Sequence, residues 1–368
     1  MNSNTLMFEE NINRNINKNI TNIDSIDGSI SDININNIKS VFGKEKLDEL
    51  KRELIEKKII LVICGPTCTG KTKTAFIMGK LFDTDIISVD SMQAFKGMDI
   101  GTDKQDLSKY FIKQYMIDIC EPDHNLTAVE FRDIARNIIE SEFFLKSKIP
   151  LIVGGSGLHL RAILDNLMKV PQGDAAIRKE INEEIKRFGL QKLYENLYDI
   201  DKAYAEKISP NDKRRIIRAL EVFKKTGKKY SDYLNTWNER KSIYNSILIG
   251  FNADRKYLYE NIRKRVNNMI SLGLVEEVRN LVNKGYKNAY SMQQAIGYKE
   301  IIKYLDNEYS LKKAIEEIEK NTRHLAKKQN TWFKADKRIN WVTISNYSNT
   351  NDLLRDIIEI IYKQISNF

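Results

Sequence analysis

A glycine-rich loop is the clearest chemical feature of the sequence. It consists of Gly65, Pro66, Thr67, Cys68, Thr69, Gly70, Lys71 and Thr72. This is the pattern G-x-x-x-x-G-K-[S/T], placed between an apolar run and a predicted helix, where glycines let backbone N–H groups converge on phosphate oxygens. Lys71 supplies a full positive charge, the helix N-terminus adds a partial one, and the hydroxyl of Thr72 is the expected Mg²⁺ ligand. The loop predicts a di- or triphosphate ligand but not its fate.

A carboxylate follows the next apolar run. Asp90 comes directly after residues 86–89, at the predicted end of a strand. An ATPase or a small-molecule kinase uses an acid in such a place to hold its metal ion. From the loop and this acid alone, those functions stay open.

The apolar runs predict the scaffold that positions these residues. Strands are expected at 59–64, 86–89, 149–153 and 246–251, with a last edge strand at 341–344. Helices at 73–81 and 128–145 alternate with them, which is typical of a parallel α/β sheet. Such a sheet gathers ligands at the carboxyl ends of its strands. We therefore predict an α/β fold with a P-loop NTPase-like parallel sheet core.

Further helices divide the chain into regions. Charged amphipathic stretches at 177–188 and 212–226 predict an inserted helical lobe, and long helices are expected at 254–284, 293–306, 310–334 and 351–366. The predicted organisation is a disordered Asn/Ile-rich tail at 1–45, a first core part at 46–173, the inserted lobe at 174–245 and a second core part at 246–368.

Composition narrows the class of protein. The chain has 368 residues, a formal net charge of +10 and three cysteines, Cys64, Cys68 and Cys120. The positive charge favours a polyanionic partner, and three cysteines are too few for a disulfide framework. The first forty residues are polar and carry five acidic side chains, which argues against a transit peptide. No run is long enough to span a membrane, so we expect a cytoplasmic protein, as a monomer.

Six ordered motifs resemble those of the tRNA dimethylallyltransferase family, also called tRNA isopentenyltransferases. The resemblance covers about residues 59 to 341. The matching segments are Gly65 to Thr72 (G-P-T-x-x-G-K-T), Asp90 to Thr102 (D-S-M-Q-x-Y-K-G-M-D-I-G-T), Gly154 to Leu158 (G-G-T-G-L), Pro210 to Asp212 (P-N-D), Gln294 to Glu300 (Q-A-I-G-Y-K-E) and Thr322 to Phe333 (T-R-x-x-A-K-R-Q-x-T-W-F).

The resemblance implies a reaction. The family transfers a dimethylallyl group from dimethylallyl diphosphate to N6 of adenosine 37, in tRNAs that read codons beginning with U. It implies that Asp90 is the general base for the weakly nucleophilic amine, that Ser156 orients the reacting groups, and that Arg265 reaches the diphosphate. The phosphate loop and Mg²⁺ at Thr72 would then stabilise the leaving diphosphate.

The resemblance also implies contacts to the tRNA anticodon stem-loop, whose target base must leave its stack. The residues expected to contact tRNA are Asp90, Ser91, Met92, Gln93, Ser156, Arg178, Arg214, Arg215, Ile216, Ile217, Arg218, Gln294, Gly297, Tyr298, Lys299, Arg323, Lys327, Lys328, Gln329 and Trp332.

Departures from the family pattern concern neighbouring positions. Phe95 replaces a common Tyr, His159 stands where Tyr is frequent, Asp103 and Gln105 depart from G-T-A-K-P, and Asn261 replaces a frequent Arg. The Asn261 change removes one auxiliary phosphate contact. The alternatives to a tRNA prenyltransferase are an adenylate prenyltransferase that uses free AMP or ATP, a P-loop small-molecule kinase, and an RNA-binding module without catalysis.

Overall fold

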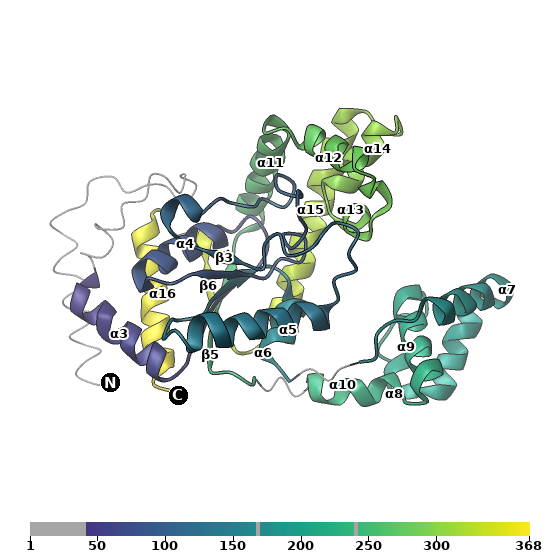
Figure 1. Cartoon of the computed structure of the whole chain (residues 1–368), viewed down its shortest axis with the longest axis horizontal. Coiled ribbons are helices and arrows are strands. Elements are labelled where there is room, and N and C mark those ends of the chain that lie inside the picture. Colours follow the sequence, from purple (N-terminus) through teal and green to yellow (C-terminus); the bar gives the residue numbers. More distant parts are fainter. Residues whose placement is uncertain (1–41, 167–169, 239–241) are drawn as a thin grey trace. The chain divides into compact units, whose positions relative to one another are not determined.

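The computed structural model describes residues 42–166, 170–238 and 242–368 (Figure 1). The predicted tail at 1–45 lies outside the described residues up to residue 41. Phe42 is buried, and helix α3 (Lys44–Glu56) begins inside the range assigned to the tail. The described residues divide into two compact units, the first within 42–163 and 244–368 and the second within 164–243.

A six-stranded sheet forms the centre of the first unit. Its strands are β1 (Ile60–Cys64), β2 (Ile86–Ser88), β3 (Gln114–Tyr115), β4 (Leu151–Gly154), β5 (Ser246–Asn252) and β6 (Ile339–Thr343). The order is β3-β2-β4-β1-β5-β6, and every pairing is parallel. Cys64 at the end of β1 pairs with Gly154 at the end of β4 and with Gly250 of β5, so β1 and β4 end at one level and β5 extends two residues further, to Asn252. The predicted parallel core is confirmed, and β3 is a strand that the sequence pattern did not predict.

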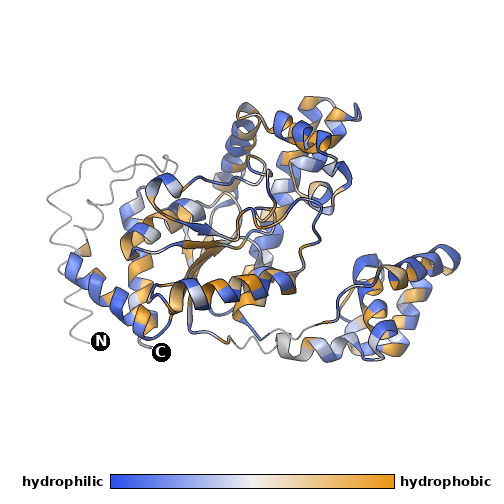
Figure 2. Cartoon of the chain, viewed as in Figure 1, coloured by the Kyte–Doolittle hydropathy of each residue, from blue (hydrophilic) through white to orange (hydrophobic). Residues whose placement is uncertain are grey.

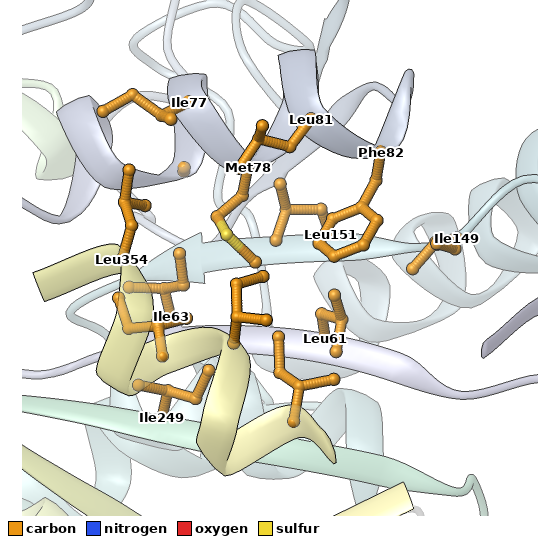
Figure 3. Close-up of a cluster of buried hydrophobic side chains, with 14 of the residues drawn as sticks. Leu61, Ile63, Ile77, Met78, Leu81, Phe82, Ile149, Leu151, Ile249 and Leu354 are labelled. Carbon is orange, nitrogen blue, oxygen red and sulfur yellow. The ribbon is translucent and has the colours of Figure 1, made fainter. Parts of the chain in front are cut away.

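One face of the sheet packs against α4 (Lys71–Phe82) and α16 (Thr350–Ile365). Leu61 and Ile63 of β1 point into this layer, where they meet Met78 of α4 and Leu354 of α16 (Figure 3). All five residues of β1 are buried, so the opposite face of the sheet is covered as well. Figure 2 shows the central strands mainly in the hydrophobic colour and the edge strand β3 in the hydrophilic one, whereas α5 alternates between the two colours.

The segment predicted as a helix at 128–145 is helical throughout but not uniform. It consists of α5 (Ala128–Ile138) and a π-helical turn, η3 (Ile139–Phe144). The short helices η2 (Ser108–Tyr110) and α6 (Gly157–Leu164) lie elsewhere in the same unit. A π turn inserts one residue into the helix ladder, which a hydrophobic pattern of period 3.6 does not reveal.

The C-terminal helices form a second hydrophobic cluster. They are α11 (Arg255–Ser271), α12 (Leu274–Asn283), η4 (Tyr286–Asn288), α13 (Tyr290–Gln294), α14 (Tyr298–Leu305) and α15 (Leu311–Lys334). The prediction of single helices at 254–284 and 293–306 is wrong. Gly273 and Gly297 both have a φ of 98°, which ends one helix and starts the next.

The second unit is a helical insert. Its helices are α7 (Ala175–Ile200), α8 (Lys202–Ala205), α9 (Lys213–Thr226) and α10 (Tyr230–Asn238). They enclose a small core of their own, and α7 bends at Gly189, whose φ is 81°. The unit starts earlier than the expected residue 174, because Leu164 already accepts a 2.8 Å hydrogen bond from Ile243 N–H. The entering and leaving segments are thereby joined. No helix in the described part of the chain is long and apolar enough to cross a membrane.

Candidate active site at the carboxyl ends of the strands

The phosphate loop runs from the end of β1 to the start of α4. Gly65 has a φ of 135°, and a Cβ there would lie 2.4 Å from the carbonyl oxygen of Phe251. Gly70, with a φ of 77°, turns the chain into α4. Thr69 Oγ1 donates a 2.8 Å hydrogen bond to the carbonyl of Pro66, which closes the loop on itself. These contacts explain why glycines stand at both ends of the motif.

Lys71 is the loop cation, and its amine lies against the loop. Nζ donates a 2.6 Å hydrogen bond to the carbonyl of Pro66. Burial lowers the pKa of Lys71 from 10.5 to about 8, and the positive charge of Arg265 acts in the same direction, whereas the Asp90 carboxylate opposes it. Two cations that face one phosphate loop repel each other, and an anionic ligand between them relieves that repulsion.

Arg265 of α11, which the resemblance assigns to the diphosphate, contacts the phosphate loop. Its Nη1 lies 3.1 Å from Thr67 Oγ1 and 3.2 Å from a carboxylate oxygen of Asp103. One turn earlier on α11, Asn261 donates to the carbonyl of Cys68 over 3.5 Å. The helical cluster therefore contacts the loop at two points.

Asp90 follows β2, and its backbone neighbours join it to β4. Val89 N–H donates to the Val153 carbonyl over 2.7 Å, and Ser156 N–H donates to the Val89 carbonyl over 3.2 Å. A Cβ at Gly154 would lie 2.1 Å from that carbonyl oxygen, so the two chains touch. Asp90 Oδ1 accepts a 3.0 Å hydrogen bond from Met92 N–H, which fixes the carboxylate at the head of its loop. Asp90 and Ser156 thus stand at the ends of adjacent strands.

Ser156 has a defined partner. Its Oγ lies 2.7 Å from Nδ1 of His159. Burial lowers the pKa of His159 to about 4, and the ring packs edge-on against Phe131, with 4.7 Å between centroids. At neutral pH the imidazole is uncharged. It therefore orients the hydroxyl without adding a positive charge to the site.

Gln329 of α15 joins two loops of the site. Its Oε1 accepts a 2.9 Å hydrogen bond from Thr67 N–H, and its Nε2 donates to the Gly155 carbonyl over 3.0 Å. A Cβ at Gly157 would lie 2.0 Å from the ring of Trp332, one turn further along α15. Sequence reasoning assigned Gln329 to tRNA. In this structure its amide holds the phosphate loop beside the turn that carries Ser156.

Two other predicted tRNA residues are engaged inside the protein. The amide of Gln93 accepts from Ser88 Oγ over 2.6 Å and donates to the Thr102 carbonyl over 3.0 Å. Tyr298 is fully buried, and its hydroxyl donates to Glu277. Both residues therefore position the loop after Asp90.

Glu277, on α12, was not singled out from the sequence. Its carboxylate accepts hydrogen bonds from the backbone N–H groups of Asp99, Ile100 and Gly101, at 3.1, 2.7 and 3.3 Å. One acid thus fixes three residues of the loop that starts at Asp90. The only sequence signal was its place in a helix rich in charge.

In the insert, the predicted tRNA-contacting arginines differ in their surroundings. Arg178 and Arg218 both bind Glu221, at 2.9 and 2.7 Å, and the side chain of Glu221 is 0% exposed. Arg215 pairs with Asp212 over 3.4 Å, whereas Arg214 is exposed. Ile216 is fully buried in the core of the insert, and Ile217 packs against that core, so both support the fold.

The remaining predicted tRNA residues belong to the first unit. Lys327 and Lys328 are exposed, and Trp332 is 40% exposed. Arg323 pairs with Glu319 over 3.2 Å and lies 5.5 Å from the centre of the Tyr259 ring.

Five other predicted tRNA residues also lie in the first unit. Gln294 is exposed at the end of α13, Gly297 is buried at the start of α14, Lys299 lies 3.7 Å from Glu300, and Ser91 and Met92 are half-buried beside Asp90.

The site offers little to a metal ion by itself. In the three described ranges, no group of three or more His, Cys, Asp or Glu side chains could hold one. Thr72 is the second residue of α4, so its hydroxyl stands at the phosphate end of the helix. Mg²⁺ commonly binds one or two protein oxygens together with phosphate oxygens and water. The residues present fit a magnesium ion that arrives with a phosphate ligand.

Comparison with known proteins gives this arrangement its family. The model of the IPP transferase family matches residues 93–336, and that of isopentenyl transferase matches residues 58–116. A tRNA dimethylallyltransferase of Thermoanaerobacter sp. (strain X514) is 43% identical over 307 residues, which cover 82% of this chain and 97% of the relative. The chain belongs to the tRNA dimethylallyltransferase family.

Other members of the family agree over the same length. The tRNA dimethylallyltransferase of Finegoldia magna is 40% identical and covers 83% of this chain and 99% of its own. The structure of the tRNA isopentenylpyrophosphate transferase from Bacillus halodurans superposes with a TM-score of 0.62 at 34% identity, over 84% of this chain and 98% of that one. A eukaryotic dimethylallyltransferase acting on tRNA superposes with a TM-score of 0.68 at 26% identity, over 81% and 77%.

Proposed function

We propose that this chain transfers the dimethylallyl group of dimethylallyl diphosphate to N6 of adenosine 37 in tRNAs reading codons that begin with U. The observation that carries the proposal is the placement of a phosphate loop and a carboxylate, Asp90, at the same edge of the sheet. The two functions of the reaction, holding a leaving diphosphate and accepting a proton, then fall to separate groups. Membership of the family supports the substrate pair.

The protein's share of the chemistry follows from these positions. The C1–O bond of the donor breaks, and its electron pair leaves with the diphosphate. The N6 lone pair forms the new bond to C1, and Asp90 accepts the proton that N6 loses. The exocyclic amine is a weak nucleophile, so a carboxylate within reach lowers the barrier where the positive charge grows.

Charge on the departing diphosphate is met by fixed donors. The N–H groups of the phosphate loop other than that of Thr67, together with Lys71 and Arg265, are the donors for that group, and the fold holds them beside the loop before the bond breaks. Ser156, oriented by His159, is placed to hold the reacting groups in line. Mg²⁺, held by Thr72 and the phosphate oxygens, would supply further charge neutralisation.

The RNA is bound by cations that the fold leaves exposed. Lys327 and Lys328 of α15 and Arg214 of the insert are the candidates for phosphate contacts, with Trp332 as a stacking surface. The target base must leave its stack to reach Asp90. We propose that the protein acts as a monomer and consumes no ATP.

The deciding experiment supplies radiolabelled dimethylallyl diphosphate together with either tRNA carrying adenosine at position 37 or free AMP. We expect label in the tRNA alone, with diphosphate as the only other product. Label in AMP would favour an adenylate prenyltransferase, and stoichiometric ADP release in the presence of ATP would favour a kinase. The Asp90→Ala variant should lose transfer and still bind inorganic diphosphate.

A further inference from the structure

The arginine that faces the leaving group is shared with a carboxylate. Nη1 of Arg265 contacts both Thr67 Oγ1 of the phosphate loop, at 3.1 Å, and Oδ2 of Asp103, at 3.2 Å. The side chains of Arg265 and Asp103 are 27% and 39% exposed, so water reaches the pair only in part. Any anion that binds Arg265 at the loop therefore lies close to a fixed negative charge.

The position of Asp103 is built into its loop. The residue has a φ of 59°, a conformation that Asp and Asn tolerate better than other side chains. Its N–H donates to the Ile100 carbonyl over 3.1 Å, and its second carboxylate oxygen accepts a 3.0 Å hydrogen bond from Gln105 Nε2. Glu277 fixes the Ile100 N–H on the other side at 2.7 Å. The carboxylate is held in place on both sides.

A carboxylate in this position has two opposing effects on a diphosphate. It anchors the guanidinium, which favours binding, and it repels the phosphate oxygens, which opposes binding. Thr67 also anchors Arg265, so the guanidinium keeps a partner in the loop if the Asp103 carboxylate is removed. The repulsion of the phosphate oxygens comes from the Asp103 carboxylate and is lost with it. Two like charges about 6 Å apart at an effective dielectric constant of about 20 shift binding by more than tenfold, and partial exposure reduces this to roughly three- to tenfold.

We propose that Asp103 sets the affinity of the site for diphosphate by opposing Arg265, so that the product leaves more readily. The inference rests on the proposed function, since it takes diphosphate as the leaving group. Product release limits turnover in many enzymes, and the loop N–H groups, Lys71 and Arg265 would otherwise hold the diphosphate tightly. Asp103 thus lowers the affinity for the donor and speeds the release of the product.

The test is the binding of inorganic diphosphate, with Mg²⁺, to the full-length protein, measured by titration calorimetry. Asp103→Asn keeps the shape and removes the charge. We expect diphosphate to bind about three- to tenfold tighter to this variant and monophosphate to gain less, because repulsion scales with ligand charge. In turnover, the KM for dimethylallyl diphosphate should fall and inhibition by added diphosphate should strengthen. Asp106→Asn, which removes the same charge from an exposed residue bonded to Ser108, should change none of these values.

The sign of the change separates the outcomes. A damaged loop or a misplaced Arg265 would weaken the binding of diphosphate. Weaker or unchanged affinity in Asp103→Asn therefore overturns the proposal. Asp103→Ala must change the affinity in the same direction as Asp103→Asn. Equal gains in Asp106→Asn would reduce the effect to net charge and overturn it as well. If the wild-type protein does not bind diphosphate, the proposed role of the phosphate loop is wrong. If the wild-type protein binds diphosphate and Asp103→Asn binds it equally well, only the proposed role of Asp103 is wrong.

Discussion

Helices α9 and α15 both carry several basic residues, yet the fold uses them differently. On α9, Arg218 binds a carboxylate that is 0% exposed, and Arg178 from α7 binds the same group. On α15, Lys327 and Lys328 are exposed, and the described residues provide no ion pair for either. A row of cations in a sequence therefore has two meanings. Such a row indicates a phosphate-binding surface only where its cations are not already paired with a buried acid.

Removing Arg218 should have the largest effect on stability. Burial raises the pKa of Glu221, but hydrogen bonds from Arg218, Asp174 N–H and Arg178 outweigh it and hold the pKa below its ordinary value. Arg218→Ala should lower the free energy of unfolding of the insert by about 2–3 kcal/mol, because a buried acid loses a partner. Urea unfolding followed by circular dichroism measures this.

The same variant has a pH signature. The stabilisation of a carboxylate whose folded pKa is lowered is present above its unfolded pKa and disappears as the pH falls through the folded pKa. The difference between wild type and Arg218→Ala should therefore be full near pH 7 and shrink below about pH 4. Arg215→Ala, which breaks only an exposed pair with Asp212, should change stability by less than about 0.5 kcal/mol. If both variants lose the same free energy of unfolding, Arg218 has no greater structural role than Arg215.

Gln329→Ala should have the largest effect on catalysis from α15. Losing the bridge between Thr67 N–H and the Gly155 carbonyl lets two loops of the site separate, and a misplacement of about 1 Å can reduce kcat/KM by roughly 10²-fold. Affinity for tRNA should change less than twofold. Steady-state kinetics and a separate tRNA binding assay divide the two effects. Thr331→Ala, which changes an exposed neighbour on the same helix, is the control. If Gln329→Ala weakens only the affinity for tRNA, Gln329 acts as a tRNA contact and not as a bridge between the loops.

The two exposed lysines should control tRNA affinity. Lys327→Ala with Lys328→Ala should weaken binding about tenfold and reduce the slope of log K against log salt by about 1.4 to 1.8, since two phosphate contacts are lost. Filter binding at several salt concentrations provides both values. The matched double change Lys312→Ala with Lys313→Ala, near the start of the same helix, should leave the slope unaltered. Similar slopes for both pairs would mean that only net charge matters.

Arg214→Ala should have the smallest effect of the series. Arg214 is an exposed cation of α9, and one phosphate contact corresponds to a decrease of about 0.7 to 0.9 in the salt slope. We expect an affinity loss of roughly two- to threefold and no change in thermal stability. A loss as large as that of the lysine pair would show that α9 also presents a phosphate surface.

Local signals could be predicted from the sequence. The phosphate loop and Asp90 each follow a buried strand, so their placement depends on a few adjacent residues. Helix breaks could not be predicted as reliably. Gly273 and Gly297 fit within amphipathic patterns, and only their left-handed backbone separates the helices.

Contacts between residues that lie far apart in the chain also could not be predicted from the sequence. Tyr298 and Ile216 were both expected to contact tRNA, but both side chains are buried. Asp103 was visible only as a departure from the family pattern, because its partner Arg265 lies 162 positions later in the chain. Whether a charge is exposed or paired depends on contacts between distant segments, which composition and periodicity do not contain.

The carboxylate of Glu277 has a kinetic consequence for the loop that follows Asp90. The N–H of Ile100 can exchange its hydrogen with solvent only when its 2.7 Å bond to α12 breaks. Deuterium uptake at Ile100 should therefore follow the breaking of the contact between this loop and α12, rather than the mobility of an unattached surface loop. An amide close in sequence to Asp90 would then report how often the loop separates from α12.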